Sequence, residues 1–108
     1  MDTFVIVVYA PVEAAESVRS ALALAGAGAI GDYSACSFSS RGIGRFTPGD
    51  GAHPSIGSVG TPEQVEEERI EVICPRDAVA VALDAMVEAH PYEEPAYHVY
   101  QALTRADF

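Results

Sequence analysis

The stretch Phe4-Val5-Ile6-Val7-Val8-Tyr9 decides the fold, because everything after it can be placed against one buried strand. A continuous run of β-branched and aromatic residues is typical of a central strand that is covered on both faces or lies at an interface. Pro11 follows, and proline at a first turn predicts a helix start. Apolar residues then recur at helical spacing at Val12, Ala15, Val18, Leu22 and Ala25. Gly26, Gly28 and Gly31 predict the helix end.

The middle of the chain reads as strands separated by a long loop. Residues 33–40 alternate around Cys36 and Phe38, which predicts a half-buried strand. Arg41-Gly42 then predicts a turn into a short strand over 43–46. Residues 47–62 are rich in glycine, proline and serine and predict a loop, and loops of this length in small domains are often functional. Residues 66–74 predict another strand, with Ile70, Val72 and Cys74 on one face.

The last third predicts a second helix and a final strand. Pro75-Arg76-Asp77 starts the helix, and Pro91 predicts its end by about Ala89. Its apolar stripe is Val79, Ala82, Leu83, Met86, Val87 and His90. A strand over 96–103 completes a βαββαβ order, with a small extra strand or hairpin in the middle. We expect one α+β domain over 1–108, of the ferredoxin-like class, with two helices on one face of a four-stranded antiparallel sheet. The other face should then need cover from another subunit.

The charged residues of the chain argue against several classes of partner and of catalytic site. Sixteen acidic residues stand against six basic ones, and the net charge is -10. Such a surface repels phosphate backbones and anionic membranes, so we expect no nucleic-acid or membrane partner. All six basic residues are arginines, which excludes Schiff-base lysine chemistry and the usual P-loop. Without a basic amino-terminal region or a long apolar span, the sequence predicts a soluble cytoplasmic protein. Cys36 and Cys74 are far apart and show no CxxC spacing, so we expect two small buried side chains in strands.

His90-Pro91-Tyr92-Glu93-Glu94-Pro95-Ala96-Tyr97 is the most unusual segment. The end of a helix stabilises a protonated histidine, and nearby carboxylates do the same. One interpretation is a metal or ligand site at His90 and Glu93, completed by His53, His98 or a neighbouring chain. Any bound divalent metal should be weak, because no spacing supplies three or four ligands. The other interpretation is structural, with prolines stiffening a turn whose tyrosines pack.

Gly42-Ile43-Gly44-Arg45-Phe46 is the second candidate segment. Arg45 could hold a phosphate or carboxylate, or the glycines could mark a bulge with Arg45 in an ion pair. We expect this segment to approach the 90–97 turn, with Arg45 or Arg69 paired to Glu93 or Glu94. The loop residue His53 has a plain structural alternative. The acidic run Glu63, Glu66, Glu67 and Glu68 reads by default as a solvated edge.

Four motifs carry a resemblance across nearly the whole chain. They are Gly42-x-Gly44-Arg45-Phe46-x-Pro48, Gly51-Ala52-x-Pro54-x-Ile56-Gly57-x-x-Gly60-x-x-Glu63, Glu67-x-Arg69-Ile70-Glu71 and the His90–Tyr97 string. Together they resemble the middle domain of bacterial Nif-three-like proteins, described as dinuclear-metal proteins or type 2 GTP cyclohydrolases. The His-Pro-Tyr-Glu string also resembles CutA, the divalent-cation-tolerance protein. His53 departs from the asparagine expected in the family.

The resemblance implies a PII/CutA-like fold, a homotrimer with inward-facing sheets, and clefts between subunits for small ligands or metal ions. The family's metal ligands lie in flanking domains, so no catalytic residue is carried over and no cofactor is required. We therefore expect a ligand-sensing or regulatory protein without catalysis of its own. The alternatives are a divalent-metal-binding protein of CutA type and a residual nucleotide or phosphoester hydrolase. The candidate ligand-binding or interface residues are Gly44, Arg45, Phe46, Pro54, Ile56, Gly57, Glu63, Arg69, Tyr92, Glu94 and Tyr97.

Overall fold

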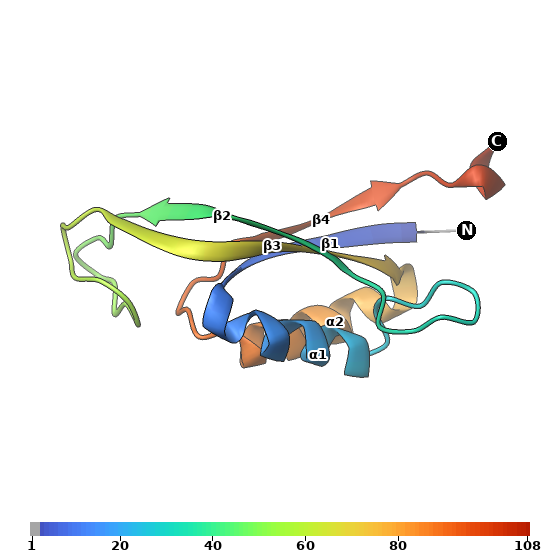
Figure 1. Ribbon diagram of the computed structural model, residues 1–108, viewed down its shortest axis with the longest axis horizontal. Helices are drawn as coiled ribbons and strands as arrows, with labels where there is room; N and C mark the ends of the chain where they lie inside the picture. Colours follow the sequence, from blue (N-terminus) through green and yellow to red (C-terminus); the bar gives the residue numbers. More distant parts are fainter. Residues whose placement is uncertain (1–2) are drawn as a thin grey trace.

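The computed structural model describes residues 3–108 and contains one four-stranded sheet and two α-helices. The elements in chain order are β1 (Thr3–Pro11), α1 (Ala15–Leu24), β2 (Phe38–Phe46), β3 (Glu63–Pro75), α2 (Arg76–Ala89) and β4 (Tyr97–Ala102), with 3₁₀ turns at Val12–Ala14 and Arg105–Asp107. The predicted α+β, ferredoxin-like fold is confirmed. Figure 1 shows both helices beneath the sheet, with the upper face bare.

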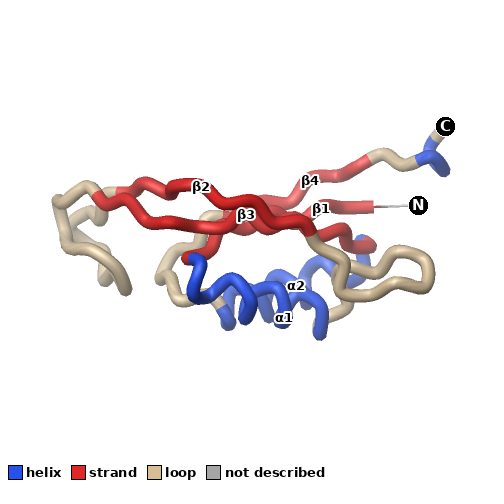
Figure 2. The backbone as a smooth tube through the Cα atoms, in the orientation of Figure 1, coloured by secondary structure: helices blue, strands red, loops and turns tan. Residues whose placement is uncertain are grey.

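The sheet order is β2-β3-β1-β4, and every neighbouring pair is antiparallel. β1 and β3 are therefore the central strands, and β2 and β4 are the edges. In the register, Val7 lies opposite Glu71 on β3 and opposite His98 on β4. The blue helices and red strands of Figure 2 form two separate layers. This two-layer packing places one core between sheet and helices.

The core forms where the two predicted helical stripes meet the apolar face of the central strands. Ile6, Val8, Ile70 and Val72 from the sheet are buried against the helices. Val18 and Leu22 of α1 and Ala82 and Met86 of α2 complete the buried layer. Val7 alternates with these residues and belongs to the face without helices, yet it is also fully buried. The predicted apolar stripe also included Val87. This prediction is wrong, because Val87 is 40% exposed.

The largest correction concerns the middle strands. The expected turn at Arg41-Gly42 does not form, and Phe38–Phe46 is one continuous edge strand paired with β3. The expected strand over 33–40 begins only at Phe38. Within residues 3–108 no extra strand forms, and an isolated bridge between Ile30 and Tyr33 stands in that part of the chain. Glycine in a strand usually signals a turn or bulge, and here the two glycines of β2 instead leave space beside the strand.

Strand and helix ends follow the sequence closely. α2 ends at Ala89 before Pro91, as predicted. α1 is preceded by a 3₁₀ turn after Pro11, and Gly26 follows its end with a positive φ of 103° that suits glycine. β3 begins at Glu63, three residues earlier than predicted, and extends with β2 past the end of β1 (Figure 1). Cys74 is buried in β3, as predicted, whereas the prediction is wrong for Cys36, which is half-buried and lies before β2 outside any strand.

The face of the sheet without helices carries apolar and aromatic side chains. Register places Val5, Ile73 and Tyr100 on one row across β3, β1 and β4. His98 lies beside Tyr9 and stacks on Tyr100, with ring centroids 6.3 Å and 6.0 Å apart. Tyr100 is 43% exposed and Phe38 67% exposed. No helix among the described residues is long and apolar enough to span a membrane.

Candidate functional site

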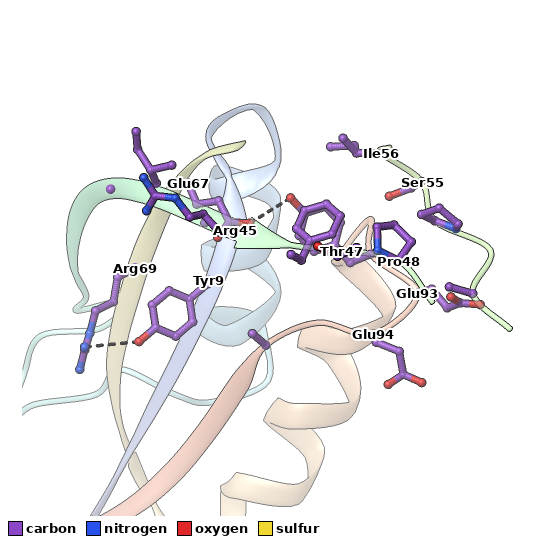
Figure 3. A pocket seen from close by; sticks show the side chains of 18 of the residues that line it. Tyr9, Arg45, Thr47, Pro48, Ser55, Ile56, Glu67, Arg69, Glu93 and Glu94 are labelled. Carbon is purple, nitrogen blue, oxygen red and sulfur yellow. Dashed lines mark hydrogen bonds between the residues drawn. The ribbon is translucent and has the colours of Figure 1, made fainter. Parts of the chain in front are cut away.

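A cavity of about 680 Å³ opens where β2 and β3 extend beyond β1. Its walls are β2, the loop over residues 47–56 and the turn over residues 92–96, and Tyr9 and Arg69 border it from the central strands (Figure 3). The two unusual sequence segments thus meet, as predicted. Of the candidate residues, the cavity is lined by Gly44, Arg45, Phe46, Pro54, Ile56, Arg69, Tyr92, Glu93 and Glu94.

The remaining candidates lie outside the lining. Gly57 lies next to Glu63, because a Cβ on Gly57 would stand 2.6 Å from the Glu63 Cγ. These two residues therefore contact each other near the base of the loop. Tyr97 begins β4 and is 41% exposed. His53, His90 and His98 do not line the cavity.

His90 is the anchor of the turn. It is 6% exposed, and its Nε2 lies 2.7 Å from the carbonyl oxygen of Tyr9. The backbone N–H of Tyr92 donates to its Nδ1 at 3.1 Å. This pattern fits a neutral ring with the proton on Nε2, where the helix-end argument favoured a protonated one. Both ring nitrogens are engaged, so a metal ion at His90 would need one of these hydrogen bonds to break.

Tyr92 joins the turn to the β2–β3 pair. Its hydroxyl donates to the Glu67 carboxylate at 2.9 Å, and its ring lies tilted on Phe46 with centroids 5.9 Å apart. Burial, followed by the hydrogen bond and the charge of Glu67, raises the pKa of Tyr92 above its ordinary value. Glu67 is 8% exposed, so the tyrosine supplies a donor to a buried carboxylate. This pair closes the inner end of the cavity.

Gly44 makes room for that pair. A Cβ at Gly44 would overlap the Glu67 carboxylate, whereas a Cβ at Gly42 would meet nothing within 4 Å. The Glu67 side chain therefore crosses β2 where β2 has no side chain. A bulge was one alternative for these glycines, and the continuous β2–β3 register shows none.

A hydrogen bond ties the loop over residues 47–56 to the turn over residues 92–96. The backbone N–H of His53 donates to the Glu93 carboxylate at 3.0 Å. The imidazole of His53 is exposed and takes no part in it. Glu93 thus holds the loop wall against the turn wall through backbone rather than through the histidine ring.

The predicted pairing of Arg45 or Arg69 with Glu93 or Glu94 is wrong. Arg69 forms an ion pair with Glu71 at 3.4 Å and donates to the Tyr9 hydroxyl at 3.4 Å. Across residues 3–108, the side chains of Arg45 and Glu94 make no hydrogen bond or ion pair. Arg69 and Glu71 are two residues apart on β3, so their side chains lie close together on the same face of the strand.

The acidic run is not the predicted solvated edge, because it belongs to the central strand β3 and two of its members are turned to partners within the protein. Glu67 is buried beneath Tyr92, as described above. Glu68 points to the helix side and pairs with Arg19 of α1, which also bonds Glu16. The bond to Glu68 is the main cause that raises the pKa of Arg19. Adjacent strand residues face opposite ways, so the two glutamates serve different layers.

Sequence reasoning missed several lining residues. Tyr9, Ser40, Arg41, Thr47, Pro48 and Glu67 also border the cavity. Glu67 could have been identified only from the strand register, which places it on β3 directly opposite Gly42 of β2. No group of three His, Cys, Asp or Glu side chains within the described part of the chain is arranged to hold a metal ion.

Comparison with known proteins explains why the four motifs occur together. A GTP cyclohydrolase 1 type 2 homolog of Mycobacterium tuberculosis is 56% identical over 94 residues, covering 87% of this chain and 25% of that protein. The homolog of Bacillus subtilis is 54% identical over 93 residues, covering 86% and 25%. A solved Bacillus cereus protein related to NIF3 superposes with a TM-score of 0.81 at 50% identity, over 94% of this chain and 26% of that one. The chain is homologous to a segment of these NIF3-related proteins. No family model matches the sequence.

The match covers only part of each curated relative. The chain spans about a quarter of the length of the curated relatives that it matches. The predicted resemblance to Nif-three-like proteins is thereby confirmed.

Solved structures also confirm the likeness in fold to CutA and PII proteins. CutA of Archaeoglobus fulgidus, a periplasmic divalent cation tolerance protein, has a TM-score of 0.64 at 22% identity, over 93% of this chain and 82% of that one. GlnK of Bacillus subtilis has a TM-score of 0.60 at 13% identity, over 94% of this chain and 86% of that one. At these identities the shared feature is the fold.

Proposed function

We propose that this chain is a ligand-sensing module of PII/CutA type, which binds a small molecule in the cavity and performs no chemistry itself. The observation that carries the proposal is the cavity, built from β2, a glycine- and proline-rich loop and a proline-stiffened turn. Concave sites with aromatic walls and a few polar groups are the usual form of small-molecule sites.

Sensing requires that occupancy change another part of the molecule, and the loop is suited to this. Residues 49–56 contribute to the cavity wall, and the loop continues beyond the end of the sheet (Figure 1). Its link to the turn is the bond from His53 to Glu93. A ligand that displaces Glu93 would release the loop, and one that leaves this bond intact would hold it.

A fragment screen followed by proton–nitrogen correlation spectra tests the binding proposal. We expect neutral and charged aromatic fragments to shift the amides of Phe46, Ala52, Ile56 and Tyr92, with the amides of α1 unchanged. A screen in which no fragment moves these amides would remove the proposal.

Assembly is the second part of the proposal, and the bare sheet face supports it. We infer a homotrimer whose subunits cover one another's Val5, Ile73 and Tyr100, since exposed apolar rows of this kind mark interfaces. Light scattering after gel filtration should give three times the mass of one chain. Tyr100→Glu should dissociate the assembly, whereas Val81→Glu, at a helix residue that is 60% exposed, should not. A monomer at micromolar concentration would contradict this part.

Two rival functions have direct assays. For a hydrolase, a panel of GTP and other nucleotides with added divalent metals should give no turnover, and turnover lost in Glu93→Gln would overturn the proposal. For a divalent-metal protein of CutA type, calorimetry with zinc and copper should detect at most weak binding. Tight stoichiometric binding that His98→Ala or His53→Ala abolishes would favour the metal function.

A further inference from the structure

Three charged side chains of the cavity lining form no hydrogen bond or ion pair within residues 3–108, namely those of Arg41, Arg45 and Glu94. Arg45 and Glu94 stand on opposite sides of the cavity (Figure 3). Arg45 comes from β2, and Glu94 comes from the turn after α2. In Figure 3 Arg45 lies toward Tyr9 and Arg69, whereas Glu94 lies on the other side, near Glu93 and beyond Pro48. Both residues are exposed, and within residues 3–108 neither side chain forms a hydrogen bond or ion pair.

Within the described residues, Arg41 and Arg45 beside this cavity lack the ion pairs that Arg19 and Arg69 form. With sixteen acidic residues and six arginines, carboxylates greatly outnumber guanidinium groups. Arg19 binds two glutamates and Arg69 binds one. Arg45 lines the same cavity as Glu93 and Glu94, yet it pairs with neither. The arrangement therefore keeps a positive and a negative group apart across a space that a ligand could fill.

The cavity wall also carries apolar and aromatic side chains. Phe46 and Tyr92 lie with ring centroids 5.9 Å apart, and Pro48 lines the same wall. Tyr92 is held by its bond to Glu67, so its ring is fixed before any ligand arrives. Fixed aromatic rings favour a flat apolar group by stacking or edge contact.

We propose that the cavity binds an elongated zwitterion: an anionic group at Arg45, an ammonium group at Glu94 and a flat apolar body between them. This rests on the proposed ligand-binding function and names its ligand class. A carboxylate can take two parallel N–H donors from one guanidinium, and an ammonium group donates to a carboxylate. A simple anion would leave Glu94 unmatched and near Glu93, and a simple cation would leave Arg45 unmatched.

Four small probes separate these cases. Para-aminomethylbenzoate and the longer para-aminopropylbenzoate carry both charges, whereas benzoate and benzylamine carry one each. Calorimetry gives the affinities. The arginine Nε–Hε signals report the anionic end, in a spectrum that is simple because the chain has six arginines and no lysine. We expect the better zwitterion to bind at least about tenfold more tightly than either single-charge probe, since each charged hydrogen bond adds to affinity.

Charge-neutralising variants assign the two ends. Arg45→Gln should lower zwitterion affinity to that of benzylamine, and Glu94→Gln should lower it to that of benzoate. Arg105→Gln and Glu88→Gln are matched controls at exposed positions outside the lining, and should leave all affinities unchanged.

Each contrary result has a defined meaning. Equal affinity for zwitterions and single-charge probes would overturn the ligand class while leaving cavity binding, and so the proposed function, in place. Shifts at His98 and Tyr100 instead of the cavity would overturn the inference. If none of the four probes binds, the inference fails, and the fragment screen decides separately whether the cavity binds other ligands.

Discussion

The two walls of the cavity differ in how their polar groups are used. At the turn, the side chains of His90 and Tyr92 form hydrogen bonds with Tyr9 and Glu67, although His90 lies outside the cavity lining. In the β2 wall, Arg45 has no partner within the described residues, as Glu94 has none in the turn, and the Glu67 side chain occupies the space that Gly44 leaves. The contrast teaches that unusual residues in one motif can do different work, some fixing the site and some left for a ligand. Substitutions at the turn and at β2 test that division.

Removing the histidine anchor should have the largest effect on stability. His90→Ala deletes a buried ring and leaves two backbone groups without a partner, so we expect a loss of about 2–4 kcal/mol in the free energy of unfolding. Urea denaturation measures it. The control His98→Ala, at an exposed histidine, should cost about 1 kcal/mol or less. Equal losses in the two variants would show that His90 is not the anchor.

Filling the space beside β2 should cost less. Gly44→Ala places a methyl group against the Glu67 carboxylate, which Tyr92 holds, so we expect destabilisation of about 1–3 kcal/mol. Gly42→Ala, two residues away with open space around its Cβ, should be neutral or stabilising by up to about 1 kcal/mol. Thermal and urea unfolding compare the pair. A Gly44→Ala variant as stable as Gly42→Ala would mean that Glu67 is free to move away.

Removing one hydroxyl should test the link between the walls. Tyr92→Phe keeps the ring on Phe46 but leaves Glu67 without its donor, so we expect a loss of about 1–2 kcal/mol. The folded protein raises the pKa of Tyr92. The unfolded chain therefore loses the tyrosine proton at a lower pH than the folded protein does. The stabilisation by this hydrogen bond is present below about pH 10 and is lost as the pH rises through the folded-state pKa. The stability difference between wild type and Tyr92→Phe should shrink in alkaline solution, and a constant difference would contradict the assignment.

Arg45→Gln should have the smallest effect on folding. Its guanidinium has no partner within residues 3–108, so we expect a change within about 0.5 kcal/mol, measured by urea unfolding. Arg19→Gln is the contrast, because Arg19 joins α1 to β3 through Glu68 and should be the more destabilising change. A large loss in Arg45→Gln would place this residue with the structural wall.

The fold could be predicted because the spacing of apolar residues and the positions of proline and glycine indicated the same helices and strands over most of the chain. The run from Phe4 to Tyr9, the two helical stripes and Pro91 fixed element type and order. β2 was misread because Gly42 normally ends a strand, and only pairing with β3 shows that it continues. The contact between the two motifs could be predicted from the topology, whereas the pairing of individual charged side chains could not. Glu67 and Glu68 are chemically identical neighbours, and register and twist decide that one meets Tyr92 and the other Arg19.

The most direct test of the divided cavity is a crystal structure of the protein with para-aminomethylbenzoate or its longer homologue. We expect the carboxylate about 3 Å from the Arg45 guanidinium, the ammonium group near Glu94, and the ring against Phe46 and Tyr92. The His90 and Tyr92 hydrogen bonds should stay in place. A ligand bound through His90 or Glu67 with those bonds broken, or bound away from Arg45, would contradict this expectation.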